Sequence, residues 1–238
     1  MGHSLGGYLV TCYALRYPSR VRHLVLVGAA GLGPRPPDNL PATTLKARFG
    51  RWGWDAGITP GVIMRCMGPL GPQFAGHYVH TRFDTESIGV RMGRKDKAAF
   101  GRYMYHIMAQ RGSSEFALRL ILAPGAWPRR PLLERAGALA VPISLVYGAH
   151  DWCDYRDGEK LAASMRARGI PATLARVPRA AHHVYVDAPQ AFNSAVLRAL
   201  RQHVASEDRR LLVDAEVAAG AALLELPMPA GFEPEDNK

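Results

Sequence analysis

Five residues at the start of the chain have the types and spacing that a nucleophilic serine requires. Gly2, His3, Ser4, Leu5 and Gly6 form the pattern G-x-S-x-G, and a helix is expected to follow directly. A serine nucleophile stands on a tight strand-to-helix turn, where small residues two positions before and after it avoid steric clash. The N-terminus of the helix favours negative charge, and the backbone N–H of Leu5 is the expected donor to an oxyanion. The alternative is a glycine-rich loop in which Ser4 only caps the helix.

Such a serine needs a base, and the base needs an acid to orient it. Asp151 and Asp154 both follow the apolar run ISLVY, and Asp151 is the preferred candidate for the acid. His182 follows a later β-rich run and is the candidate base. Serine, acid and histidine come in this chain order in one known class of hydrolytic folds. The sequence therefore predicts a catalytic triad of Ser4, His182 and Asp151, with Asp154 as the alternative acid.

Strands and helices alternate along most of the chain, which is the pattern of a parallel α/β sheet. Strands are predicted at 21–27, 143–147 and 172–177, and helices at 6–17, 159–168 and 189–204. From about 45 to 139 the pattern changes to helical fragments that are broken by glycine and proline and rich in aromatic residues. We expect an α/β domain over 1–205 with a helical lid at about 45–139. An acidic tail, partly disordered, is expected at 206–238.

The charge of the 238-residue chain is strongly basic, with a formal net charge of +10. The tail from Ser206 to Lys238 holds eight acids and three bases, so the rest of the chain is more basic still. A basic body favours an anionic partner such as a phospholipid headgroup or a phosphorylated substrate, unless the arginines only keep the surface soluble. No zinc-finger, RRM or helix-turn-helix pattern is present, so nucleic acid is not an expected partner.

The cysteines and the N-terminus exclude several other classes of protein. Cys12, Cys66 and Cys153 are too few and too scattered for a disulfide framework, and no C-x-x-C pair indicates zinc. Neither a metal site nor a cofactor site is expected. The start MGHSLGG has no charged or apolar region of a signal peptide, and no apolar run approaches the ~20 residues needed to cross a bilayer. A cytoplasmic location is therefore expected.

Four stretches of the chain together resemble one branch of the α/β-hydrolase family. They are GHSLGGYLVTCYALRYPSRVRHLVLVGAAGLGPRP, FGRYMYHIMAQRGSSEFALRLILAPGAWPRRPLLER, VPISLVYGAHDW and HHVYVDAPQAFN. The branch contains the lipid-droplet lipase coactivator, the N-acyl-phospholipid lipase, and plant and fungal proteins described as lysophosphatidate acyltransferases. The resemblance covers about residues 1–205, and its YMYH…GSSEFAL and H-x4-D motifs are features of this branch.

The resemblance also implies roles for single residues. Ser4 matches the family's nucleophile, which the coactivator has lost, so this chain resembles the catalytic members. His182 and Asp187 match the H-x4-D box that has been linked to acyl transfer, whereas Asp187 alone also reads as the acid that opens the last helix. Asp151 matches the plant form of the family's acid, and Asp154 matches the animal form.

The function implied by the resemblance is that of a serine-dependent acyl ester hydrolase or acyltransferase acting on phospholipids or lysophospholipids in lipid metabolism. Its partners would be a lipid or acyl ester substrate, with acyl-CoA as a candidate donor. The protein would attach peripherally to lipid droplets or intracellular membranes. The alternatives are a non-catalytic lipase-regulating protein at lipid droplets and an inactive fragment of such an enzyme.

The position of the motif near the first residue bears on how much of the fold is expected. In this fold the serine turn follows the fifth strand, whereas here Met1 stands directly before Gly2. We therefore expect the C-terminal portion of the fold, without the loop that supplies the second oxyanion N–H. The strand at 21–27 is then expected to have a neighbour on one side at most.

Overall fold

The computed structural model describes residues 1–35, 45–83, 94–110, 112–124 and 127–203. The tail expected at 206–238 lies outside the described residues. The central sheet has four parallel strands in the order β1–β2–β5–β6, namely β1 (Gly2–His3), β2 (Leu24–Val27), β5 (Ile143–Gly148) and β6 (Ala172–Val177). His3 pairs with Val27, and Val27 with Val146, so the carboxyl ends of the strands meet at one edge.

The neighbours of β2 differ from the expectation. The sequence predicted one neighbour at most, but β2 lies between β1 on one side and β5 on the other. The reason is that Gly2 and His3, directly before the serine turn, extend along β2 and form a two-residue strand. The prediction was therefore wrong for this strand.

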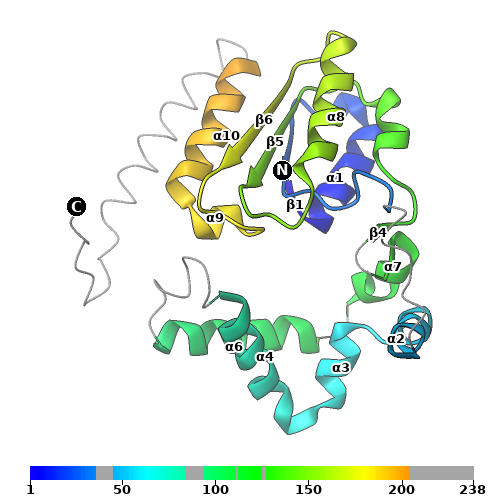
Figure 1. The fold of residues 1–238 in the computed structure, drawn as a ribbon, viewed down its shortest axis with the longest axis vertical. Coiled ribbons are helices and arrows are strands. Elements are labelled where there is room, and N and C mark those ends of the chain that lie inside the picture. Colours follow the sequence, from blue (N-terminus) through cyan, green and yellow to red (C-terminus); the bar gives the residue numbers. More distant parts are fainter. Residues whose placement is uncertain (36–44, 84–93, 111, 125–126, 204–238) are drawn as a thin grey trace, which may run out of the picture.

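Helices cover both faces of the sheet, which explains why the central strand β2 is apolar throughout (Figure 1). On one face lie α1 (Leu5–Arg16) and α8 (Tyr155–Ala167), and on the other lies α10 (Pro189–His203). Leu24 and Leu26 pack toward α1 and α8, whereas Val25 and Val27 pack toward α10. Because side chains alternate along a strand, each face receives every second residue and all four are buried.

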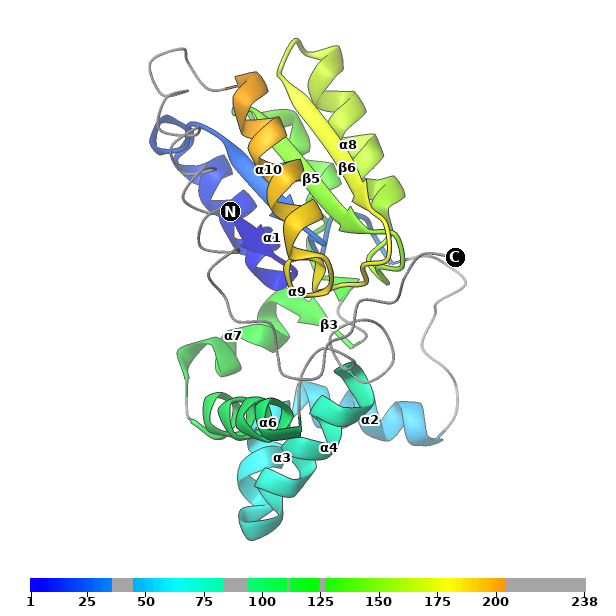
Figure 2. The same ribbon diagram turned by 90° about the vertical axis from the view of Figure 1, so that its left-hand side faces the viewer.

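The second part of the molecule is helical and lies beyond the carboxyl edge of the sheet (Figures 1 and 2). It consists of α2 (Leu45–Asp55), α3 (Pro60–Cys66), α4 (Gly71–Phe83), α6 (Arg94–Ala109) and α7 (Ser113–Ile121), followed by the antiparallel pair β3 (Leu122–Ala123) and β4 (Trp127–Pro128). Helices α4 and α6 pack along each other. We call this part the lid, and none of the described helices combines the length and apolar character needed to cross a membrane.

Short 3-10 helices complete the described chain. They lie at Pro18–Arg20, Gly68–Leu70 and Leu133–Ala138. Leu132, Ala136 and Leu139 are buried in the same core cluster as α1 and α8. The chain has therefore returned from the lid to the sheet by Leu132, before β5 begins.

Candidate active site

Ser4 stands on a strained turn between β1 and α1. Its φ of 52° and ψ of −122° make it one of two residues other than glycine with a positive φ among those described. Such a conformation costs about 1–3 kcal/mol and is maintained where the surroundings fix it, often at functional sites. The Ser4 N–H donates to the Val27 carbonyl at 3.0 Å, and the Ser4 carbonyl accepts from Gly7 N–H and Ala30 N–H at 2.9 and 3.1 Å. The Ser4 side chain makes no capping hydrogen bond to α1, which contradicts the cap interpretation.

The glycines around Ser4 are not equally constrained. A Cβ at Gly2 would meet the carbonyl oxygen of Gly6 and lie 2.7 Å from Val10 Cγ2. A Cβ at Gly7 would lie 2.8 Å from the Cβ of Ala29, so this helix position also requires glycine. A Cβ at Gly6, by contrast, would meet nothing within 4 Å. Gly2 is therefore required for steric reasons, whereas Gly6 is not, contrary to the expectation from the motif.

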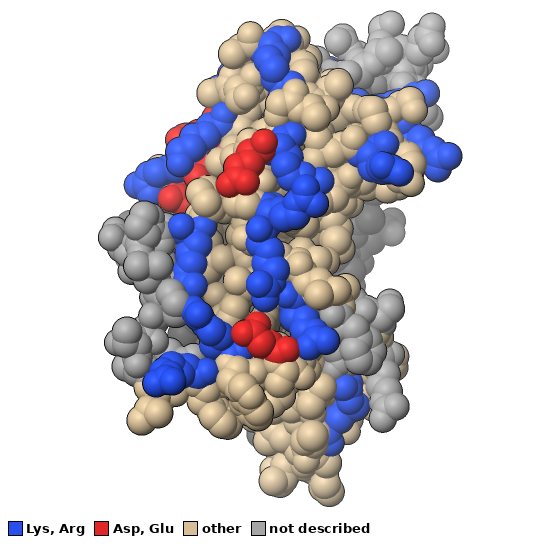
Figure 3. All heavy atoms as spheres, turned by 90° about the vertical axis from the view of Figure 1, so that its right-hand side faces the viewer, with Lys and Arg blue, Asp and Glu red and all other residues tan. Residues whose placement is uncertain are grey.

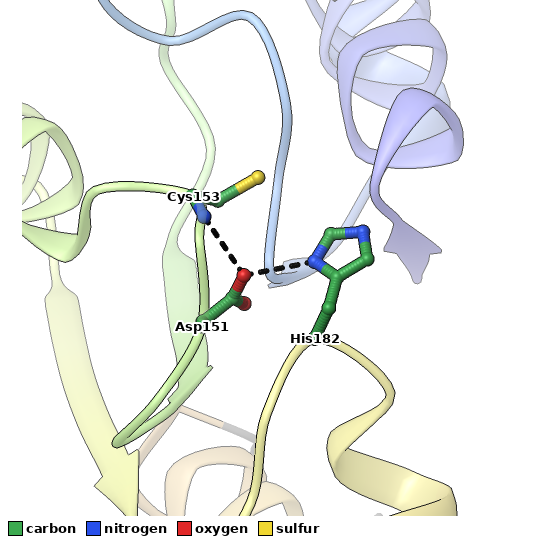
Figure 4. A group of neighbouring side chains, drawn as sticks. All are labelled: Asp151, Cys153 and His182. Carbon is green, nitrogen blue, oxygen red and sulfur yellow. Dashed lines mark hydrogen bonds and ion pairs between the residues drawn. The ribbon is translucent and has the colours of Figure 1, made fainter. Parts of the chain in front are cut away.

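Asp151 and His182 form a buried hydrogen-bonded pair at the carboxyl edge of the sheet. His182 Nδ1 lies 2.9 Å from Asp151 Oδ1, and the side chains are 7% and 1% exposed. Figure 4 shows the Asp151 carboxylate between the His182 ring and the backbone nitrogen of Cys153, which donates to Oδ1 at 2.9 Å. A carboxylate only accepts, so His182 carries a proton on Nδ1, and in the neutral ring Nε2 is then the acceptor. This is the tautomer that a general base requires.

Gly28, directly after β2, limits the space around this pair and was not among the residues predicted from the sequence. It has a φ of 47°, and a Cβ there would lie 2.5 Å from Asp151 Oδ2 and 3.2 Å from His182 Nδ1. Glycine lets the backbone after β2 approach the pair closely, and any side chain at this position would push Asp151 and His182 out of place. In the sequence Gly28 directly follows an apolar run and so marks only the end of a strand, because the residues it approaches lie far away along the chain.

Aromatic rings surround His182 and connect it to the serine turn. The rings of His3 and Trp152 lie 4.6 and 4.7 Å from the His182 ring. His3 Nε2 lies 2.9 Å from the His182 carbonyl oxygen, so it donates this hydrogen bond, and Tyr185 OH lies 3.4 Å from His3 Nδ1. Burial lowers the pKa of His3, which favours the neutral ring. Because Ser4 directly follows His3, the serine turn lies beside the loop that carries His182.

The alternative acid, Asp154, lies apart from the histidine. Its Oδ1 accepts from Arg156 N–H at 2.9 Å and caps α8, and the side chain is half-exposed. Asp187 ends the short helix α9 (Val184–Asp187), and its Oδ2 accepts from the Ala181 N–H at 2.7 Å. The Asp187 carboxylate therefore fastens the loop just before His182. The structure brings together Asp151 and His182, and of the two candidate acids only Asp151 contacts the histidine.

The site also contains three side chains of types that can bind a metal ion, namely Asp151, Cys153 and His182. One ligand atom from each lies within 4.8 Å of the others. Burial and the nearby Asp151 raise the pKa of the Cys153 thiol, which opposes the thiolate that a metal ion needs. His182 Nδ1 is already engaged with Asp151. The donor set therefore fits an acid–base pair better than a metal centre.

Leu5, the expected oxyanion donor, lies directly after Ser4 at the start of α1. Leu5 is the first residue of α1, so its backbone N–H has no acceptor within the helix. The first turn of α1 contains no acidic side chain that would offset the positive end of the helix dipole. A groove of about 500 Å³ lies elsewhere, between β6 and α10, and neither His182 nor Asp151 lines it.

Comparison with known proteins identifies the fold independently of these contacts. The family described as alpha/beta hydrolase fold matches residues 1–189. Among solved structures, MenH from S. aureus is similar with a TM-score of 0.57 at 15% identity, covering 85% of this chain and 67% of that chain.

Two curated relatives are similar in sequence over most of the chain. A 1-acylglycerol-3-phosphate O-acyltransferase of Arabidopsis thaliana is 34% identical over 220 residues, which cover 89% of this chain and 52% of that protein. A (lyso)-N-acylphosphatidylethanolamine lipase of Bos taurus is 35% identical over 205 residues, with 82% and 56% covered. The chain spans about half the length of the curated relatives it matches.

Proposed function

The chain belongs to the alpha/beta-hydrolase family, and on that premise we propose that it is a serine-dependent acyl ester hydrolase or acyltransferase acting on phospholipids or lysophospholipids. The observation that carries the proposal is the buried Asp151–His182 pair at 2.9 Å beside the strained turn of Ser4. Ser4 supplies the nucleophile, His182 the base, and Asp151 the charge that orients the base.

The reaction follows from the roles that these groups can take. His182 Nε2 accepts the proton of the Ser4 hydroxyl as its oxygen attacks the ester carbonyl. The Leu5 N–H donates to the oxyanion, and Asp151 stabilises the imidazolium. His182 then returns the proton to the departing group, an alcohol from an ester or the thiol of coenzyme A from a thioester, which leaves an acyl group on Ser4. A water molecule or an acceptor hydroxyl, deprotonated by His182, removes that acyl group and regenerates Ser4.

The substrate class is supported by the relatives and by the charge of the chain. Both relatives are named for acyl chemistry on glycerophospholipids. A net charge of +10 suits a phosphate-bearing substrate and an anionic surface. We propose that the protein works at the surface of membranes or lipid droplets, with acyl-CoA as the donor if the reaction is a transfer.

The experiment measures lipid turnover by the 238-residue protein and two variants. Lysophosphatidate and N-acylphosphatidylethanolamine are supplied in vesicles, with and without acyl-CoA. Fatty acid release identifies a hydrolase, and phosphatidate formation identifies an acyltransferase. Ser4→Ala should abolish either product, whereas Ser19→Ala, in the exposed segment Pro18–Arg20, should retain it. Equal turnover by Ser4→Ala would contradict the proposal, as would a folded protein that turned over no lipid and only bound a triglyceride lipase.

A further inference from the structure

Helix α2 of the lid presents an apolar stripe to solvent. Leu45, Phe49 and Trp52 are spaced i, i+4 and i+7, so they lie on one face of the helix. Their exposed fractions are 83%, 69% and 59%. The rings of Phe49 and Trp52 lie 5.4 Å apart. A helix of a water-soluble domain normally buries such a stripe, so the exposed one needs an explanation.

The rest of α2 fixes the helix in place with this stripe outward. Trp54 Nε1 donates to the Leu122 carbonyl at 3.1 Å, and Arg119 Nη1 donates to the Asp55 carbonyl at 2.7 Å. These bonds hold the C-terminal end of α2 against α7 and β3. Elsewhere α2 makes only slight contact with the described helices and strands, and Figure 1 shows it end-on at the outer edge of the lid. The stripe therefore belongs to a fixed helix.

Positive charge accompanies the stripe. Arg48 and Arg51 are exposed on α2 and alternate with the apolar positions. The acidic side chain at the end of the helix, Asp55, is paired with Arg129 at 3.5 Å. Figure 3 views the molecule from the side on which α2 lies, and this face is crossed by Lys and Arg side chains with only isolated acidic groups. Apolar side chains flanked by long basic ones are typical of helices that lie at the surface of an anionic membrane.

We propose that α2 is an interfacial helix that inserts Leu45, Phe49 and Trp52 into an anionic phospholipid surface while Arg48 and Arg51 bind the lipid phosphates. Its 11 residues extend only ~16 Å, about half of the ~30 Å hydrocarbon core, so the helix lies in the plane of the surface. The arginines favour a lipid surface over a protein partner because they stand beside each apolar position. The inference deepens the proposed function, since it names the surface that delivers the protein to its lipid substrate.

The test is co-flotation of the 238-residue protein with vesicles. One set is phosphatidylcholine alone, and the other contains about one third phosphatidate. The wild-type protein should bind the anionic vesicles, and Phe49→Ser with Trp52→Ser should weaken binding at least tenfold. The control is Tyr13→Ser with Tyr17→Ser. Tyr13 lies in α1 and Tyr17 directly follows it, and their exposed rings also form a pair, 5.1 Å apart. Arg48→Gln with Arg51→Gln should weaken binding to anionic vesicles and reduce its salt dependence.

A second measurement places Trp52 in the lipid without relying on affinity. Brominated acyl chains should quench part of the tryptophan fluorescence of the bound wild-type protein. In the variant Trp52→Phe, which keeps an apolar ring and should still bind, most of this quenching should disappear. Circular dichroism and the Tm of each variant show that the fold is retained.

Three outcomes would overturn the inference. They are equal loss of binding in the α1 control, unchanged quenching in Trp52→Phe, and an oligomer that the stripe variant abolishes while the wild-type protein ignores vesicles. Vesicle binding needs no turnover, so the two proposals can fail separately. If the protein bound no vesicles but still hydrolysed a soluble short-chain ester in a Ser4-dependent way, only the inference about α2 would be contradicted.

Discussion

At the scale of single residues, the hydrogen bond between Asp151 Oδ1 and His182 Nδ1 decides which ring nitrogen carries the proton. Both side chains are almost completely buried, so water does not compete for that contact. The other oxygen, Asp151 Oδ2, has no hydrogen-bond partner among the described residues. The orienting charge therefore acts chiefly through the single bond to His182 and the bond from Cys153 N–H.

The first prediction separates the two candidate acids. Asp151→Asn keeps the shape of the side chain but removes its charge and can impose the wrong tautomer on His182. We expect ester turnover to fall by roughly 10²–10⁴-fold. Asp154→Asn should leave turnover within about twofold, because asparagine caps a helix as well as aspartate does. The measurement is kcat on a soluble ester, and equal losses in both variants would contradict the assignment of Asp151.

The second prediction concerns His3 and the pH dependence of stability. Burial lowers the pKa of His3 in the folded protein below its ordinary value of 6.5. As the pH falls below about 6.5, His3 takes up a proton more readily in the unfolded chain than in the folded protein. The contribution of His3 to stability is therefore complete above about pH 6.5 and decreases as the pH falls below it. His3→Asn should reduce the fall in Tm between about pH 7.5 and about pH 5.

The control for His3 is His106→Asn, on the exposed side of α6. Because the side chain is exposed, this substitution should change Tm at neutral pH only slightly. At neutral pH His3→Asn should cost about 1 kcal/mol, through the hydrogen bond to the His182 carbonyl. An unchanged fall in Tm between neutral and acidic pH would contradict the account of His3.

At the scale of elements, the β1–α1 turn and the loop before His182 place the reacting groups. The turn depends on close approach of backbone at Gly2, and the loop is fastened by the Asp187 carboxylate. Arg179, in the same loop, is the second described residue other than glycine with a positive φ, at 57°. Both segments are therefore held in conformations that an isolated chain rarely adopts.

The third prediction distinguishes the two glycines of the G-x-S-x-G motif. Gly2→Ala places a Cβ against backbone atoms of Gly6, so the turn must shift, and we expect a loss of about 1–3 kcal/mol together with most of the activity. Gly6→Ala adds a Cβ in open space within α1, where alanine is favoured over glycine by up to about 1 kcal/mol. Urea unfolding and ester turnover measure both effects. Equal damage in the two variants would contradict the steric argument.

The fourth prediction tests whether Asp187 positions the loop or takes part in acyl transfer. Asp187→Asn retains an oxygen that can accept from Ala181 N–H, whereas Asp187→Ala does not. If the residue only positions His182, the asparagine variant should keep most hydrolysis and transfer. The alanine variant should lose both and about 1.5–3 kcal/mol of stability. Selective loss of transfer in Asp187→Asn, with hydrolysis intact, would instead support the acyltransferase box.

At the scale of the whole molecule, a parallel sheet brings together residues that lie far apart in the chain. The carboxyl ends of β1, β5 and β6 carry Ser4, Asp151 and His182 to one edge, and the lid lies beyond that edge (Figure 2). The order of β2, β5 and β6 and of the helices beside them was predictable because these strands are short β-rich runs and the helices carry apolar residues at helical spacing. The bounds of β6 were predicted as observed.

Other features depend on contacts that the sequence does not display. Helix α8 begins at Tyr155, before the predicted 159, because the Asp154 carboxylate accepts from the Arg156 N–H and caps it. Strand β1 is too short to have a pattern. The need for glycine at Gly28 arises from side chains more than a hundred positions away in the sequence, so only the folded structure shows it.

The most direct test of the central claim is labelling of the 238-residue protein with a fluorophosphonate, followed by peptide mass spectrometry. The account predicts one phosphonylated residue, Ser4, with no labelling in Ser4→Ala and normal labelling in Ser19→Ala. In His182→Gln the rate should be at least about 10²-fold lower, because the hydroxyl then has no base. A folded protein that takes no label, or that is labelled at wild-type rate in Ser4→Ala, would contradict the account.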